Sequence, residues 1–323
     1  MIHLVIQIPC YNEAETLAIA LGALPRQLEG FDEVEWLIID DGSTDDTVKV
    51  ARDNGVDHVV TFNANRGLAR GFMAGLDACI KLGADVIVNT DADNQYNADD
   101  IPKLVAPILN KEADIVVGAR PIEDIEHFST GKKFLQKLGS WVVRLASKTA
   151  IPDSPSGFRA MSRDAAMRMN VFNEYTYTLE TIIEAGQKGI AITSVPIRVN
   201  PDLRPSRLVK SIPSYIKKSI FTIVRIFVVY RPFRFFMLIG SILFALGFLV
   251  GLRFLYFYMV DEGEGHIQSV ILAAVLLGMG FQTMLVAFVA DLLATNRMLL
   301  ENTQYMIRKL VTRTVRIDSR KDD

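Results

Sequence analysis

The sequence has little of what several classes of protein depend on. Its 323 residues include only two cysteines, Cys10 and Cys79, and neither has a partner at the spacing of a zinc site. We therefore expect no disulfide framework, and a reducing compartment for the soluble part of the chain. The net charge of −2 lacks the basic surplus that nucleic-acid-binding proteins carry, which argues against nucleic acid as the main partner.

Two common phosphate-binding signatures are also missing. The P-loop pattern, GxxxxGK followed by Ser or Thr, does not occur. Gly67, Gly71 and Gly75 are spaced GxxxGxxxG, which differs from the GxGxxG of nicotinamide and flavin proteins. The N-terminus, MIHLVIQIP, lacks the charged region and the long apolar region of a signal peptide, so we expect a first strand there.

What the sequence does have is an uneven distribution of apolar residues. Hydrophobic residues make up 50% of the chain, and the mean hydropathy of +0.23 is high for a soluble protein. Residues 1–200 read as an ordinary α/β domain, whereas residues 235–294 are dense in Leu, Phe, Val, Ile and Gly. The four parts that we expect are a globular α/β domain at 1–205, amphipathic interfacial helices at 206–234, a transmembrane hairpin at 235–294 and a basic cytosolic helix at 295–323.

Short apolar runs alternate with amphipathic stretches through the first 200 residues. Candidate strands are 3–8, 34–40, 58–62, 85–89, 113–118, 158–162 and 190–195, and candidate helices are 14–28, 45–54, 68–82, 99–110 and 176–188. This alternation predicts βαβ units and a mostly parallel sheet. In such sheets ligands bind beyond the carboxyl ends of the strands, and polar motifs follow each of the first four candidate strands.

Two long apolar stretches follow. Residues 235–260 contain one charged residue, Arg253, and residues 267–290 contain none, and each exceeds the roughly 20 residues that cross a bilayer core. Two buried core helices are the alternative, but soluble core helices of that length almost always carry a polar stripe. Basic residues precede and follow the pair, while the connector 261–266 is acidic. The positive-inside rule then places both termini in the cytosol.

A run of carboxylates and amides, NTDADNQY, follows the apolar strand at 85–89. Asp91 and Asp93 stand one residue apart, and Mg²⁺ uses one or two carboxylates together with substrate phosphates. A calcium-binding EF-hand loop is the competing interpretation. It fails because Tyr96 stands where that loop needs glycine and Pro102 stands where it needs glutamate. A divalent-cation site is therefore the favoured interpretation.

Three further polar motifs follow neighbouring strands. Asp40-Asp41-Gly42-Ser43 has one carboxylate more than a helix cap needs, so one of the two is available to a base or a ribose. Pro9-Cys10-Tyr11-Asn12-Glu13 offers an aromatic ring that could stack on a base, and Asn65-Arg66-Gly67 offers a cation. These motifs predict a nucleotide site at the same edge of the sheet.

Together the motifs resemble the signature of glycosyltransferase family 2, whose members have the Rossmann-like GT-A fold. The membrane-tailed layout is similar to that of polyprenyl-phosphate glycosyltransferases, the group that includes dolichol-phosphate mannose synthase and bactoprenol glucosyltransferases. The nucleotide-binding residues that the resemblance implies are Pro9, Tyr11, Asn12, Glu13, Asp41, Gly42, Ser43, Asn65, Arg66, Gly67, Asp91 and Ala92. The family's DxDxQ metal motif corresponds to Asp91, Asp93 and Gln95, which implies Mg²⁺ or Mn²⁺ as the cofactor.

The resemblance also implies an acceptor site in the second half of the domain. The elements that match are the GxR motif at Gly118-Ala119-Arg120, the acceptor loop with Asp153, Gly157, Phe158 and Arg159, Glu180 on the next helix, and an Arg-x-Ser-basic-Leu element at Arg204, Ser206, Arg207 and Leu208. Pro205 stands where the family commonly has glycine, which is a departure from the family's pattern in the loop that carries Arg207. The residues implied to bind the acceptor phosphate are Arg120, Lys132, Lys133, Arg159, Arg204, Ser206 and Arg207.

The implied reaction transfers a hexose from a nucleoside-diphosphate sugar to undecaprenyl or dolichyl phosphate at the cytosolic membrane face, with inversion. The resemblance implies Asp93, Asp153 and Arg120 as the catalytic residues. A cation would neutralise the leaving pyrophosphate, and the lipid phosphate is already ionised, so a strong general base is not required. Asp153 is the family's usual candidate for orienting the acceptor or accepting a proton. The alternative is a turn carboxylate that pairs with Arg159.

Two other functions stay open from sequence. A processive polysaccharide synthase shares the nucleotide motifs, but neither Trp36 nor Trp141 lies in its QxxRW element, and the chain has too few helices for a channel. A non-catalytic sensor or scaffold has no reason to retain metal ligands. These motifs are compatible with several sugars, with UDP or GDP, and with undecaprenyl or dolichyl phosphate. The bilayer would be a plasma or inner membrane, or the endoplasmic reticulum in a eukaryote. The helix from about Arg297 could support a homo-oligomer.

Overall fold

The computed structural model describes residues 1–121, 149–171, 177–201, 228–260 and 267–318, together with residues 144, 147, 221, 224 and 225. The chain forms two compact units. The first unit comprises Met1–Ile216 and Glu301–Asp323, and the second comprises Lys217–Leu300. Five of the predicted acceptor residues lie outside the described residues: Lys132, Lys133, Arg204, Ser206 and Arg207. Most of the expected interfacial segment at 206–234 lies outside them as well.

The first unit is built on a seven-stranded sheet. Its strands are β1 (His3–Cys10), β2 (Glu33–Asp40), β3 (His58–Thr61), β4 (Val86–Asn89), β5 (Ile115–Ala119), β6 (Arg159–Ser162) and β7 (Ile192–Pro196), in the order β3-β2-β1-β4-β6-β5-β7. Every neighbouring pair is parallel except those of β6, which runs antiparallel to both β4 and β5. The predicted α/β fold with a mostly parallel sheet is therefore confirmed.

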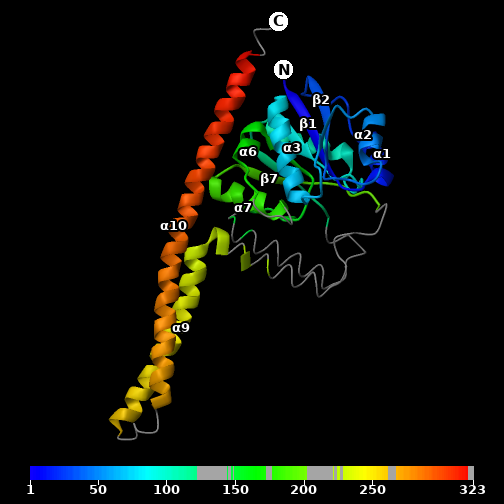
Figure 1. Ribbon diagram of the computed structural model, residues 1–323. Helices are drawn as coiled ribbons and strands as arrows, with labels where there is room; N and C mark the ends of the chain where they lie inside the picture. Colours follow the sequence, from blue (N-terminus) through cyan, green and yellow to red (C-terminus); the bar gives the residue numbers. More distant parts are fainter. Residues whose placement is uncertain are drawn as a thin grey trace. The chain divides into compact units, whose positions relative to one another are not determined.

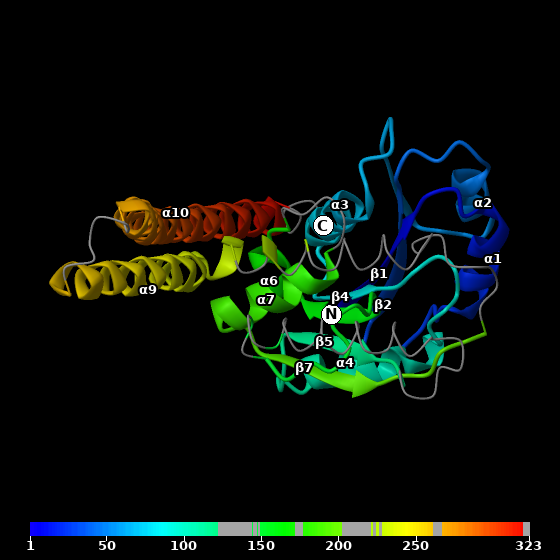
Figure 2. The ribbon, with the colours of Figure 1, turned by 90° about the horizontal axis from the view of Figure 1, so that it is seen from below.

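Helices cover both faces of this sheet (Figure 2). They are α1 (Ala14–Ala23), α2 (Thr47–Asp53), α3 (Leu68–Leu82), the 3₁₀ turn η1 (Ala98–Asp100), α4 (Ile101–Leu109), α6 (Arg163–Arg168) and α7 (Thr178–Lys188). Apolar residues of α1 and α4 share one buried core with the strands. On the other face, Gly75 of α3 lies so close to the sheet that a Cβ there would stand 2.8 Å from Ile39 Cδ1. The glycines of α3 thus serve helix-to-sheet packing.

The second unit contains two long apolar helices, α9 (Pro232–Met259) and the first part of α10 (Ile267–Asp318), which lie side by side (Figure 1). Both are long and apolar enough to cross a membrane, and only 11% and 17% of their most apolar windows are buried. A core helix of a soluble protein would be mostly buried, so outward-facing apolar side chains favour membrane association.

Glycines let α9 and α10 approach closely. A Cβ on Gly280 would stand 2.6 Å from the Phe244 nitrogen, and one on Gly247 would stand 2.8 Å from the Leu277 nitrogen. Small residues at such contacts are a common means of packing helices in membranes. The second stretch is also longer than expected, because α10 continues as one helix to Asp318.

Candidate active site

The loops after β1 and β2 are joined to each other by hydrogen bonds. Asn12 N–H donates to Ser43 Oγ (2.9 Å), Asn12 Oδ1 accepts from Thr44 N–H (2.8 Å), and Glu13 N–H donates to Thr47 Oγ1 (2.9 Å). Asn12 takes a positive φ of 54°, a conformation that asparagine tolerates better than most residues. The side chain of Tyr11 is 42% exposed beside them. Two of the predicted nucleotide-binding motifs therefore form one connected edge.

Asp41 ties the third predicted motif to this edge. Its Oδ1 accepts from Arg66 N–H (2.7 Å) and its Oδ2 from Gly67 N–H (2.8 Å). The approach is tight, since Gly42 has a φ of 73° and a Cβ there would stand 2.6 Å from the Ala64 carbonyl carbon. Glycine is the residue that fits both the positive φ and the close contact. The carboxylate thus organises the Arg66 loop, and its predicted contact with a nucleotide stays a prediction.

The aspartates of the DADNQ segment lie directly after β4 and are partly exposed. Partial burial and the neighbouring charge of Asp93 raise the pKa of Asp91 to about 7, although Arg120 and Arg159 act to lower it. Asp93 Oδ1 accepts a hydrogen bond from Gln95 N–H (3.2 Å). Two carboxylates that repel each other in this way are stabilised when a cation binds between them.

The donor set suits a particular kind of cation site. Among the described residues no group of three or more His, Cys, Asp or Glu side chains could hold a metal ion. Asp91, Asp93 and Gln95 supply at most two carboxylates and an amide, which fits Mg²⁺ or Mn²⁺ completed by substrate oxygens better than an all-protein cage. The fit depends on the chemistry of these side chains, and the predicted metal role of the three stays a prediction.

Arg120 and Asp153 form a two-point ion pair near the same edge. Arg120 Nε lies 2.7 Å from Asp153 Oδ2 and Arg120 Nη2 lies 3.1 Å from Oδ1. The Arg120 main-chain N–H adds a third bond to Oδ2 (3.2 Å). The interpretation that Asp153 pairs with Arg159 is therefore wrong. Arg120 follows the end of β5 and meets the Asp153 loop there, whereas Arg159 begins β6 and bonds to α7.

The Arg159 side chain is fully buried. Nη1 donates to Thr178 O (3.2 Å) and to Thr181 Oγ1, Nη2 donates to Ser156 O, and the guanidinium lies 5.4 Å from the centre of the Tyr177 ring. Its Nε has no partner in the described part of the chain, nor do the buried hydroxyls of Ser154 and Ser156. Buried polar atoms without partners are costly, and a bound ligand can satisfy them. The predicted contact of Arg159 with an acceptor phosphate stays a prediction.

A buried polar network that sequence reasoning missed lies beneath the aspartates. Asn89 Oδ1 accepts from Gln7 Nε2 (2.9 Å), and Asn89 Nδ2 donates to Gly157 O (2.9 Å) and Tyr177 Oη (2.8 Å). Gly157 N–H donates in turn to Tyr96 Oη (2.9 Å). The Tyr96 hydroxyl also bonds to the Asp91 carboxylate. Polar residues inside candidate strands, as Gln7 and Asn89 are, were the available signal for it.

The remaining predicted acceptor-loop residues are inside the protein. Phe158 is fully buried and stacks on Tyr96 with ring centres 5.1 Å apart. Gly157 leaves room for Asp91, because a Cβ there would stand 3.1 Å from both carboxylate oxygens. Glu180 lies in the first turn of α7 and is 8% exposed. The acceptor loop is thus packed against the carboxylate segment.

The comparisons with known proteins agree with this geometry. Residues 5–169 match the family model described as glycosyl transferase family 2, which is half of the chain. The chain belongs to this family. The family and the α/β fold were both predicted from the sequence motifs, and membership makes the protein a glycosyltransferase.

The regions that align with this chain cover most of the length of two named relatives. A UDP-N-acetylglucosamine–dolichyl-phosphate N-acetylglucosaminyltransferase of Methanococcus voltae is 30% identical over 224 residues, which is 61% of this chain and 85% of that one. An undecaprenyl-phosphate mannosyltransferase of Micrococcus luteus is 28% identical over 201 residues, 59% of this chain and 80% of that one.

A similar solved structure supports the fold. It is glucosyl-3-phosphoglycerate synthase of Mycobacterium tuberculosis, crystallised with Mn²⁺, UDP and glucosyl-3-phosphoglycerate. Its TM-score with this chain is 0.54 at 20% identity, over 70% of this chain and 78% of that one. The likeness shows a shared GT-A architecture.

Proposed function

We propose that this glycosyltransferase moves a hexose from a nucleoside-diphosphate sugar to a polyprenyl phosphate. The observation that carries the proposal is the pair Asp91 and Asp93 at the carboxyl edge of the sheet, in a chain that also has two helices of membrane length. Relatives named for dolichyl-phosphate and undecaprenyl-phosphate acceptors support a lipid phosphate as the acceptor class.

The donor would bind along the edge formed by the loops after β1, β2 and β3. Tyr11 presents a ring for stacking, and Asp41 holds the turn at Arg66 and Gly67 in place by accepting their N–H groups. Asp91, Asp93 and Gln95 would hold Mg²⁺ or Mn²⁺, which when bound neutralises the charge that develops on the leaving pyrophosphate. A cation would also keep Asp91 ionised at neutral pH despite its raised pKa.

The acceptor would approach from the Arg120 and Asp153 side. A phosphate monoester is an anion at neutral pH, so the side chains have to attract and orient it, and proton removal is a secondary task. The paired state of Arg120 means that a phosphate has to compete with Asp153 for its N–H groups, or share them. Single displacement at the anomeric carbon by this phosphate would invert its configuration.

The membrane arrangement follows from the charges that flank α9 and α10. Lys217, Lys218, Arg225, Arg231 and Arg234 precede the pair, and Arg297, Arg308, Lys309, Arg313 and Arg316 follow it. On the positive-inside rule, the first unit and both termini would face the cytosol. Reactivity of single cysteines placed at exposed positions of the first unit, in sealed vesicles of known orientation, tests this assignment.

The reaction itself is tested by incubating the purified full chain with radiolabelled UDP- and GDP-sugars and either undecaprenyl or dolichyl phosphate. We expect a lipid-linked product with at least one donor, lost on addition of EDTA and restored by Mg²⁺ or Mn²⁺. Product formed only on a water-soluble phosphate such as 3-phosphoglycerate would contradict the lipid acceptor, and full activity in EDTA would contradict the metal role.

A further inference from the structure

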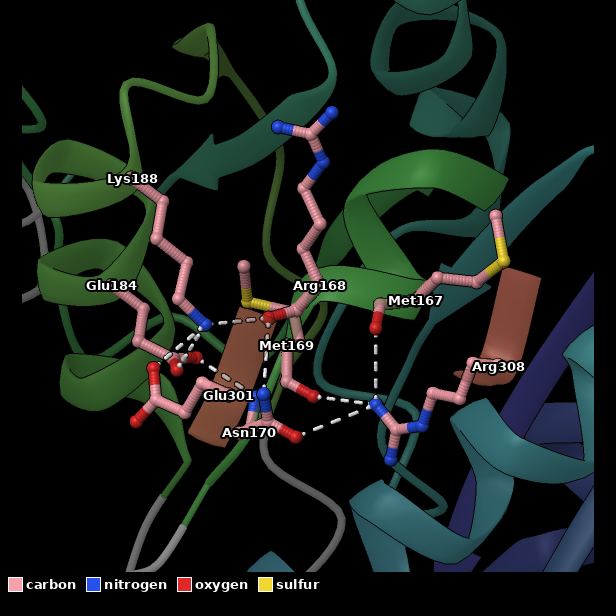
Figure 3. Close-up of polar contacts among 8 residues, drawn as sticks. All are labelled: Met167, Arg168, Met169, Asn170, Glu184, Lys188, Glu301 and Arg308. Carbon is pink, nitrogen blue, oxygen red and sulfur yellow. Dashed lines mark hydrogen bonds and ion pairs between the residues drawn. The ribbon is translucent and has the colours of Figure 1, made fainter. Parts of the chain in front are cut away.

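The end of the C-terminal helix packs against α6 and α7 within the first unit (Figure 3). Arg308 Nη1 donates to two carbonyls at the end of α6, Met167 O (3.1 Å) and Met169 O (3.0 Å), and Arg308 Nη2 pairs with Asp77 of α3 (3.1 Å). The last carbonyls of a helix have no partner within it, so Arg308 acts as a C-terminal cap supplied from elsewhere in the chain.

A second contact reaches α7. Lys188 Nζ donates to Arg168 O (2.7 Å) and lies 2.9 Å from Glu184 Oε1 and 3.0 Å from Glu301 Oε2. Glu184 Oε2 accepts from Asn170 N–H (2.9 Å). Both carboxylates are nearly inaccessible, with side chains 3% and 5% exposed. One lysine thus joins α6, α7 and the C-terminal helix in the interior.

The same face of α7 also contacts residues beside the candidate site. Tyr177, Thr181, Glu184 and Lys188 are spaced i, i+4, i+7 and i+11, which places them along one side of the helix. The first two contact the Asn89 network and Arg159, and the last two contact the C-terminal helix. An 11-residue helix is about 16 Å long and rigid, so a shift at one end moves the other.

We infer that Glu301–Lys309 of α10 position α7, and through it the loop of Gly157 and Arg159, so that sugar transfer depends on this docking. Glu301 and Arg308 are then positioning residues that act without touching a substrate. The inference rests on the proposed function for its kinetic readout. The loops around Tyr11, Asp41 and Arg66 make their hydrogen bonds elsewhere, which predicts that donor binding is spared.

The test compares Glu301→Gln and Arg308→Met with Gln304→Ala, a control at an exposed position of the same helix. We expect each docking variant to lower kcat/KM for polyprenyl phosphate roughly three- to thirtyfold while KM for the nucleotide sugar changes less than about twofold. The control should match wild type, and Arg308→Lys should recover part of the loss. Equal losses for donor and acceptor, in step with a lower Tm, would reduce the docking to a structural role.

Hydrogen exchange tests independently of activity whether Glu301 positions α7. In Glu301→Gln, amides of Thr178–Lys188 should exchange faster while those of Ala14–Ala23 stay as in wild type. Uniform change in both helices, or no change in either, would overturn the inference even if the variant folds poorly in the assay. If the wild-type chain transfers no sugar to a lipid phosphate, the proposed function fails, but this arm still decides the coupling.

Discussion

Two groups of loops at the carboxyl edge of the sheet are held by different forces. The N-terminal loops are residues 11–13, 41–47 and 62–67, and what we call the C-terminal loops are residues 150–159, which include the first residue of β6, together with the start of α7 at 177–181. In the N-terminal loops, polar side chains accept main-chain N–H groups, as the Asp41 carboxylate, which is buried at 5% exposure, does from Arg66 and Gly67. In the C-terminal loops, charges lie inside the protein, where Asp153 is 1% exposed and Arg159 is 0% exposed.

This difference indicates in which loops a substitution changes ligand binding and the free energy of unfolding together. A loop fixed by hydrogen bonds from side chains to main-chain N–H groups loses about 1–2 kcal/mol per bond when altered, so its substitutions affect ligand binding more than stability. A buried charge is different, since removing one partner leaves the other unpaired at a cost of about 3–5 kcal/mol. We therefore expect substitutions in the C-terminal loops to affect folding and activity together, and those in the N-terminal loops to affect mainly activity.

The largest effect is expected between the two groups, at the carboxylate pair. Asp93→Ala removes one ligand of the proposed cation and should lower kcat on the order of a thousandfold, or about 4 kcal/mol, measured by lipid-linked product formation. Asp99→Ala is the matched control, because its side chain is 79% exposed on the turn that follows. If Asp93→Ala keeps more than about a tenth of the wild-type activity, Asp93 has no essential role in the reaction.

The next effect tests the C-terminal loops. Asp153→Asn keeps the shape of the side chain but leaves Arg120, which is 17% exposed, without its charged partner. We expect a loss of about 3 kcal/mol in the free energy of unfolding, followed by chemical denaturation in mild detergent. Lys103→Met is the control, since Lys103 is 54% exposed and its partner Asp100 keeps Arg198. The control should lose less than about 1 kcal/mol in the free energy of unfolding. Equal losses in the two variants would show that the buried ion pair contributes no more stability than the exposed one.

The pH dependence of stability should have opposite signs at Glu184 of α7 and at Asp45 of the N-terminal loops. Burial raises the pKa of Glu184 to about 7, against the lowering effect of Lys188. Because the folded state holds this proton more tightly than the unfolded state, the stability that it contributes is full below about pH 4.5 and is lost as pH rises through 7. At Asp45, burial acts to raise the pKa, but hydrogen bonds from Thr47 and Ala14 N–H lower it, so its contribution is instead lost as pH falls.

The pH prediction is checked by the apparent Tm of the wild type and of Glu184→Gln between pH 5 and pH 8. The wild type should lose up to about 3 kcal/mol of stability from this group over that range, and the variant should lose less. A profile of Glu184→Gln that runs parallel to wild type would assign the dependence to other groups.

Sequence reasoning reached the edge of the site but not its interior. The motifs around Asp41 and Asp91 could be placed because strand periodicity and parallel topology bring strand ends together. The partner of Asp153 could not, because the antiparallel strand β6 inserts between β4 and β5 and turns Arg159 toward α7. The pattern of apolar residues in the sequence also does not show that Arg308 of the C-terminal helix caps α6. Arg308 is 139 residues away from Met169, whose carbonyl it binds, and such a distant contact leaves no local signal.

The smallest effect belongs to the N-terminal loops and completes the contrast. Asp41→Asn keeps one acceptor oxygen but turns an NH₂ group toward one of the two N–H groups from Arg66 and Gly67, which should cost about 1–2 kcal/mol. Because the bonds lost go to main-chain N–H groups and no partner charge is left unpaired, we expect KM for the nucleotide sugar to rise about tenfold while the apparent Tm shifts less than in Asp153→Asn. KM for the lipid phosphate should stay unchanged, as should every parameter of the exposed control Asp46→Asn. A rise in acceptor KM equal to that in donor KM would show that the two groups of loops act as one, and the distinction between hydrogen bonds to the main chain and buried ion pairs would no longer separate donor from acceptor.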